Sequence, residues 1–98
     1  MMLVYVTCKD VKEAEKISRH LLEKKLIACA NYFPVKSMYW WDNQIVDDSE
    51  FVLIVKCVNF EKVKKEVKKV HSYKIPCILK IDAVGNEEYM NWVQSVCK

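Results

Sequence analysis

Glycine and proline are almost absent from this chain of 98 residues, which contains one glycine, Gly85, and two prolines, Pro34 and Pro76. Their scarcity excludes a glycine-rich phosphate-binding loop and a flexible linker. The apolar fraction of 52% and the charged fraction of 30% are typical of a globular, soluble chain without a disordered segment. We therefore expect a single domain over residues 1–98.

Motifs for catalysis and for nucleic-acid binding are also missing. The sequence shows no Ser-His-Asp arrangement, no paired carboxylates beside glycines and no H-x-x-x-H zinc spacing, so we expect no enzymatic activity. A net charge of only +3 does not indicate nucleic-acid binding. The lysines of residues 62–69 alternate with apolar residues at helical spacing, which is typical of a solvated helix face.

Disulfide pairing is not indicated either. The five cysteines are scattered singly, and no two of them form a C-x-x-C pair. This pattern favours reduced thiols in the cytoplasm over a disulfide framework. The apolar run at residues 2–8 is too short for a signal peptide or a membrane span. We therefore expect a cytoplasmic protein with no membrane partner and no obligatory cofactor.

The dominant feature of the sequence is an apolar stretch over residues 26–58, interrupted at Asp42-Asn43. β-Branched and aromatic residues on both sides of this break predict a β-hairpin, and Asp and Asn tolerate the backbone angles of a two-residue turn. Pro34 in the first arm predicts a bulge or an edge strand. At about 3.3 Å per residue, such arms extend well past a small domain, which indicates an oligomer.

The remaining elements complete a ferredoxin-like pattern. Capping residues Asp10 and Glu13 open the first helix. The order β-α-β-β-α-β-α predicts an α+β fold, in which a four-stranded antiparallel sheet carries helices on one face. Several strands are apolar on both sides, so we expect neighbouring subunits to cover the bare face. The predicted elements outside the hairpin are a strand at residues 2–8, a helix at residues 10–25 with an apolar stripe of Val11, Ala14, Ile17, Ser18, Leu21 and Leu22, a helix from Asn59 to His71, a strand at residues 77–84, and a helix from Glu87 with an inner stripe of Tyr89, Trp92, Val93 and Val96.

Few side chains are candidates for chemistry. His71 precedes the last predicted strand, and Cys29 and Cys77 add thiols, so the three together offer soft ligands for copper or zinc. A single cysteine more often packs as a small core residue, and a helix-terminal histidine is more often structural, so both interpretations remain open. Lys56 lies in an apolar strand, where a lysine either pairs across an interface or anchors a ligand.

The predicted hairpin tip carries the largest exposed aromatic area. Tyr39, Trp40 and Trp41 lie next to the turn, and aromatic residues on a protrusion commonly anchor interfaces. Base stacking on these rings requires a basic groove beside them, which the sequence does not display. We therefore assign the three residues to a subunit interface.

Taken together, these residues resemble the CutA divalent-cation tolerance family. The most specific parts of the resemblance are LIACAN at residues 26–31, YWW at residues 39–41 and the loop formed by His71, Tyr73 and Pro76. The resemblance implies a ferredoxin-like subunit, a homotrimer with interlocked hairpins, a PII-like architecture, and a role in tolerance of copper and other divalent metals. It also implies that the inter-subunit loop has exchanged its usual acids for Lys74 and Cys77, which favours a soft metal over a hard one.

Three hypotheses follow. The first is a cytosolic, non-enzymatic homotrimer that binds divalent or soft metal ions, with copper as the first candidate and Cys29, Cys77 and His71 as ligands. The second is a PII-like sensor that binds a small anionic ligand in a cleft between subunits, with Lys56, Tyr73 and Glu50 in the cleft. The third is an oligomeric scaffold that docks a partner protein through the hairpin tip.

Overall fold

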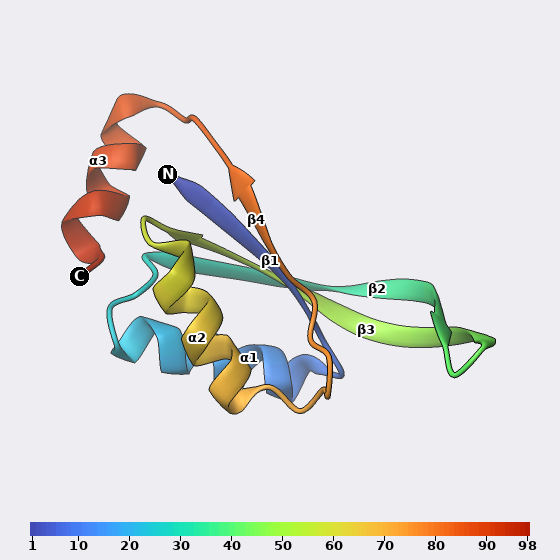
Figure 1. Cartoon of the computed structure of the whole chain (residues 1–98). Helices are drawn as coiled ribbons and strands as arrows, with labels where there is room; N and C mark the ends of the chain where they lie inside the picture. Colours follow the sequence, from blue (N-terminus) through green and yellow to red (C-terminus); the bar gives the residue numbers. More distant parts are fainter.

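The computed structural model describes all 98 residues and contains the predicted alternation of strands and helices. The four strands form one antiparallel sheet with the order β2-β3-β1-β4, as a ferredoxin-like chain requires. The helices α1 and α2 lie together on one face of this sheet, and α3 lies near the N-terminus of the chain (Figure 1). The elements are β1 (Met2–Cys8), α1 (Val11–Glu23), β2 (Cys29–Trp41), β3 (Gln44–Cys57), α2 (Phe60–Val70), β4 (Ile78–Asp82) and α3 (Glu87–Val96).

The core lies between the sheet and the two crossover helices. Alternate residues of β1 and β3 point into it, so Val4 lies opposite Val55 and Val6 lies opposite Leu53, all with no exposed surface. The inner faces of both helices close the core. The buried helical residues of the core cluster are Ala14, Ile17, Leu21, Val63 and Val67.

The hairpin is built as the sequence predicts. Asp42 and Asn43 have φ angles of 50° and 62°, so both adopt the left-handed conformation of a tight two-residue turn. The pairing of β2 with β3 runs without a break from Cys29 opposite Lys56 to Trp41 opposite Gln44. Pro34 therefore sits at the sheet edge and not in a bulge, because β2 is the outermost strand.

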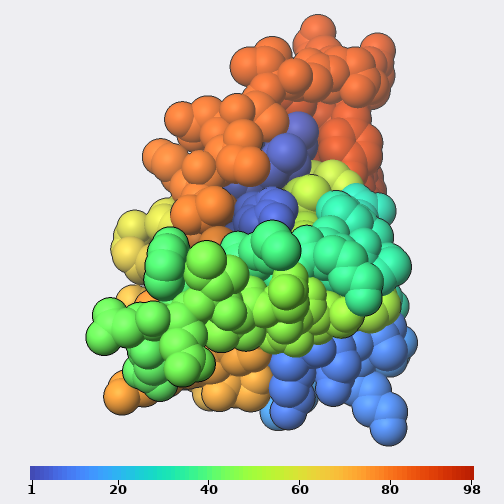
Figure 2. Space-filling view, turned by 90° about the vertical axis from the view of Figure 1, so that its right-hand side faces the viewer, coloured from blue at the N-terminus to red at the C-terminus, as the bar shows by residue number.

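The helices α1 and α2 leave the second face of the sheet uncovered (Figure 1). Leu3 and Tyr5 of β1 point to this face, and they pair with Ile81 and Leu79 of β4. Leu79 and Ile81 retain 53% and 44% of their surface exposed. In Figure 2 the dark-blue atoms of β1 are visible between the orange β4 segment and the green hairpin, which lies across the front of the molecule. The isolated chain therefore exposes apolar side chains on this face of the sheet.

Three details differ from the predictions. The last strand is shorter than predicted, because only Ile78–Asp82 pairs with β1. Leu22 was assigned to the apolar stripe of the first helix, but it is 42% exposed because the sheet lies under the other side of that helix. Of the inner stripe predicted for the last helix, only Val93 is fully buried, and Trp92 is 45% exposed. No helix is both long and apolar enough to cross a lipid bilayer.

Candidate functional site

The loop after α2 is tied to the sheet by His71, whose side chain has no exposed surface. Its Nε2 lies 2.8 Å from the carbonyl oxygen of Thr7, and its Nδ1 lies 3.1 Å from the backbone nitrogen of Tyr73. A carbonyl only accepts and a backbone N–H only donates, so Nε2 carries the proton and Nδ1 accepts. Both ring nitrogens of His71 are therefore engaged in hydrogen bonds to the backbone.

Glu13 reaches the same place from the first turn of α1. Its Oε1 accepts from the backbone N–H of Lys9 at 2.9 Å, and its Oε2 accepts from that of Ser72, also at 2.9 Å. The same Oε2 lies 3.9 Å from His71 Nδ1. Burial raises the pKa of Glu13, but the hydrogen bonds from Ser72 and Lys9 together with His71 outweigh it, so the net pKa is lowered. Glu13 thus remains a carboxylate although it is only 6% exposed.

His71 and Glu13 form a cluster with a third residue, Cys8, which is the last residue of β1. Its Sγ, a carboxylate oxygen of Glu13 and a ring nitrogen of His71 all lie within 4.8 Å of one another. Burial, reinforced by the negative charges of Glu13 and Glu50, raises the pKa of Cys8 to about 12. The thiol is therefore protonated at neutral pH. A thiol, a carboxylate and an imidazole are a donor set suited to zinc or copper.

A hydrogen-bonded pair, Tyr73 and Glu50, lies beside this cluster. The hydroxyl of Tyr73 donates to Glu50 Oε2 over 2.6 Å, and Glu50 is only 6% exposed. Burial, followed by the hydrogen bond to Glu50, raises the pKa of Tyr73. Burial and the charge of Glu50 also raise the pKa of the nearby Cys77 thiol. Tyr73 and Glu50, two of the residues predicted to line a ligand cleft, thus contact each other within one chain.

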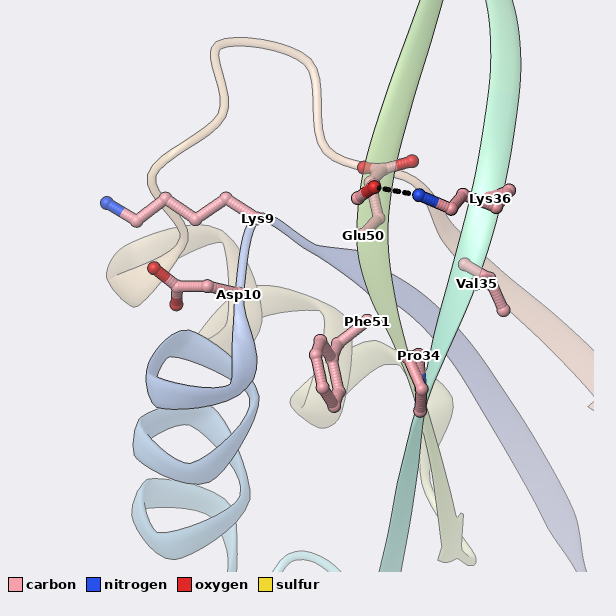
Figure 3. A pocket seen from close by; sticks show the side chains of 8 residues that line it. Lys9, Asp10, Pro34, Val35, Lys36, Glu50 and Phe51 are labelled. Carbon is pink, nitrogen blue, oxygen red and sulfur yellow. Dashed lines mark hydrogen bonds between the residues drawn. The ribbon is translucent and has the colours of Figure 1, made fainter.

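An open hollow of about 470 Å³ lies where the hairpin leaves the body of the molecule. Figure 3 shows Lys36 extending toward β3, where its ammonium donates a 2.8 Å hydrogen bond to Ser49 Oγ, whereas Lys9 extends away from the hairpin. Pro34 and Phe51 supply apolar surface, and Glu50 lies between the hollow and the loop of Tyr73. Lys36 has no carboxylate within 4 Å.

Comparison with known proteins decides the family. The model of the CutA1 divalent ion tolerance protein family matches residues 2–96. The chain belongs to the CutA1 family. The divalent-cation tolerance protein CutA of Thermotoga maritima is 46% identical, with 96% of each chain covered, and that of Archaeoglobus fulgidus is 45% identical, covering 92% of this chain and 91% of the relative.

Solved structures of CutA1 proteins share the fold. The A. fulgidus structure, described as a periplasmic divalent cation tolerance protein, superposes with a TM-score of 0.95 at 43% identity over 98% of both chains. A PII-like protein CutA from Nostoc gives a TM-score of 0.92 at 25% identity, covering 100% of this chain and 98% of that one. The resemblance inferred from the sequence, including the PII-like architecture, is thereby confirmed.

Within this CutA1 chain the three predicted metal ligands do not meet. Cys29 begins β2 opposite Lys56 and at the level of Leu3, whereas Cys77 precedes Ile78, which pairs with Val6. Cys77 is thus at the level of Thr7, so the separation is about four residues of 3.3 Å along the strands and about three strand spacings of 4.8 Å across them. A metal set that combines Cys29 with Cys77 or His71 therefore requires two copies of the chain.

Lys56 is also remote from the other two predicted cleft residues. Its ammonium lies 3.7 Å from Cys29 Sγ and donates to the side-chain oxygen of Asn31. Glu50 lies six residues earlier on the same strand, about 20 Å away. Lys36, which the sequence interpretation did not single out, lines the hollow together with Glu50.

The sequence interpretation missed Cys8 and Glu13 as site residues. Glu13 was assigned only to the helix cap, a role it also has, since its backbone N–H donates to Asp10 Oδ1 over 2.8 Å. The available signal was the topology, because β1 ends and α2 ends at the same edge of a β-α-β-β-α-β sheet. The interface candidates Tyr39, Trp40 and Trp41 are 38%, 71% and 45% exposed, as expected of a protruding tip.

Proposed function

We propose that this chain acts in divalent-cation tolerance as a cytoplasmic homotrimer with one domain per subunit, and that it holds a divalent or soft metal ion, with copper as the first candidate. Cys8, Glu13 and His71 are the residues that hold the ion. The observation that supports this choice is the convergence of their three donor atoms within 4.8 Å. The five free thiols support a reducing compartment.

The open face of the sheet supports the trimer. Leu79 and Ile81 on that face, and Met38 and Trp40 on the hairpin, are between 44% and 74% exposed. Apolar surface of this extent is unfavourable in water at about 25 cal/mol per Å². Packing the sheets of three copies against one another, with each hairpin clasping a neighbour, removes this surface from water.

The protonation states of the ligands determine how an ion binds. Because the pKa of Cys8 is raised to about 12, its thiol must lose a proton when a cation arrives. His71 Nδ1 must also give up the N–H of Tyr73, since its other nitrogen is the donor to Thr7. The proton lost from Cys8 makes binding weaker at low pH and favours a cation that forms strong bonds to thiolate. The hydrogen bond lost from Tyr73 weakens binding at every pH.

Equilibrium dialysis with Zn(II), and with Cu(I) under anaerobic conditions, tests the assignment. We expect one ion per chain in the unmodified protein, tighter binding at pH 8 than at pH 6, and loss of binding in Cys8→Ala. Glu13→Gln, which keeps the shape of the side chain, should weaken binding as well. Cys57→Ala is the matched control, because Cys57 is equally buried but has no histidine or carboxylate beside it.

The same measurement on a Cys29→Ala, Cys77→Ala double variant distinguishes the two ligand sets. Our assignment predicts unchanged stoichiometry in this variant. Loss of the ion there, with retention in Cys8→Ala, would instead place the ion between copies at the set predicted from the sequence. Retention in every variant would remove all of these residues from metal binding.

The hollow beside Glu50 supports a second candidate function, a sensor for a small anionic ligand. Lys9 and Lys36 both line the hollow, and the only polar partner of the Lys36 ammonium is the neutral hydroxyl of Ser49. The volume of about 470 Å³ suits a small metabolite. A thermal-shift screen of phosphate and dicarboxylate compounds should give a hit that Lys36→Ala abolishes and Lys56→Ala does not. A screen without any shift would rule this candidate out.

A further inference from the structure

The outer surface of the helical layer carries cations that no carboxylate neutralises. The acidic side chains of the chain form ion pairs with Lys24, Lys64, Lys69 and Lys80 among the lysines. Six other cations on α1 and α2 are exposed, and none has a carboxylate oxygen within 4 Å. We call these six residues the basic helical face: Lys12, Lys16, Arg19, Lys62, Lys65 and Lys68.

The six cations form two short rows. On α1, Lys12, Lys16 and Arg19 follow one another at spacings of four and three residues, so they lie on one side of the helix about 5–6 Å apart. On α2, the spacing of Lys62, Lys65 and Lys68 is three residues. The two helices are packed side by side on the same face of the sheet (Figure 1). Two adjacent rows of cations therefore face solvent together.

The carboxylates in the same layer do not cancel this charge. Glu66 lies between the two helices, where its carboxylate oxygens are 2.9 Å from His20 Nε2 and 3.0 Å from Lys69 Nζ. Glu61 pairs with Lys64 at 2.8 Å. Two exposed carboxylates of these helices, Glu15 and Glu23, form no ion pair. They are fewer than the six unpaired cations. The surface therefore holds a net excess of positive charge, and it complements a polyanion.

We propose that the basic helical face docks inorganic polyphosphate, a flexible linear chain of closely spaced phosphates. The exposed aromatic residues all lie outside α1 and α2, so the surface has no platform on which nucleic-acid bases stack. The apolar stripes of both helices, which include Ile17 and Val67, are buried against the sheet and are not free to insert into a membrane. What remains is recognition of phosphate charge by lysine and arginine.

The proposed trimer strengthens this docking without being required for it. Packing through the open sheet face leaves the helices of every copy pointing outward. A single polymer that reaches two or three of these faces gains avidity over one face alone. In a monomer the same six residues bind the same polymer more weakly.

Fluorescence anisotropy with labelled polyphosphate, at several salt concentrations, tests the proposal on the full chain. We expect saturable binding that weakens steeply with salt, because each phosphate contact releases counterions. The triple variant K62E, K65E and K68E should lose at least about tenfold in affinity and lower the slope of log K against log salt by about 2–3. Circular dichroism before and after substitution checks that the helices are intact.

The matched control is the triple variant K9E, K25E and K98E, which changes the net charge equally at exposed lysines outside the basic helical face. Our proposal predicts a loss of less than about threefold there. Equal losses in both variants would show a response to net charge alone and would overturn the proposal. Absence of salt-dependent binding would overturn it too, as would equal affinity for a single-stranded nucleic acid of the same charge.

Discussion

The two halves of strand β3 place apolar residues of similar size, Leu53 and Ile45, in opposite surroundings. Leu53, in the half that lies under the helices, has no exposed surface, whereas Ile45, in the half that forms the hairpin arm, is 65% exposed. Both residues are β-sheet residues paired to β2 in one continuous register. The difference arises because α1 and α2 cover only the part of the hairpin that lies in the body of the molecule, and the part near the turn extends beyond them.

This contrast shows that an apolar strand pattern identifies a surface that must be covered, and not what covers it. In the body, the helices of the same chain supply the covering surface. In the arm and on the open sheet face, no element of the chain does so. The covering surface there is, in our proposal, the other subunits.

The largest effect on stability should come from replacing one apolar residue in each half of β3 by alanine. Leu53→Ala leaves a cavity in the core and should lower the free energy of unfolding by about 2–5 kcal/mol at every protein concentration. Ile45→Ala should act only through association, so its effect should grow on dilution. Urea denaturation at several protein concentrations separates the two. A concentration-independent loss in Ile45→Ala would contradict the assignment of the arm to an interface.

Two tyrosine–carboxylate pairs provide the next comparison. Tyr73→Phe leaves the buried Glu50 without its 2.6 Å hydrogen bond and should cost about 1–3 kcal/mol of unfolding free energy. Tyr39→Phe removes a 3.0 Å bond to Asp48 at an exposed position and should cost about 0.5 kcal/mol or less. Thermal denaturation of both variants measures the contrast. Equal losses would mean that the loop of Tyr73 is not anchored as described.

Helix caps differ in the same way on a smaller scale. The side chain of Asn59 accepts from the N–H of Lys62 over 3.1 Å, so Asn59→Ala should lower the unfolding free energy by about 1 kcal/mol. Asn86 makes no such bond at the start of α3, and Asn86→Ala should be close to neutral. Chemical denaturation compares the pair directly. A greater loss in Asn86→Ala would contradict the described caps.

The smallest effect concerns the loss of folding stability at acidic pH. Hydrogen bonds from Lys69 and then His20 lower the pKa of Glu66 from 4.5 to about 2 in the folded chain. The stabilisation is therefore complete above about pH 4.5 and is lost as the pH falls toward 2. Glu66→Gln should flatten the pH profile of the melting temperature in this window. Glu15→Gln, at an exposed position without an ion pair, is the control and should leave the slope unchanged.

Local features of the fold were predictable from the sequence, because each depends on a few neighbouring residues. The turn at Asp42-Asn43 and the cap formed by Asp10 are examples. The site was only partly predictable. His71 contacts Thr7, which lies 64 residues earlier, and periodicity contains no information about such a contact. The exposure of Leu22 was mispredicted for the same reason, since a stripe pattern does not show where the sheet ends beneath a helix.

Native mass spectrometry of the purified, reduced protein tests the central claim most directly. The open sheet face and the exposed arm predict a complex of three copies of the 11.6 kDa chain that persists on dilution. Trp40→Ala and Ile45→Ala should shift the spectrum toward lower masses. A protein that stays a single chain at all concentrations would contradict the claim that other copies cover the bare half of the sheet.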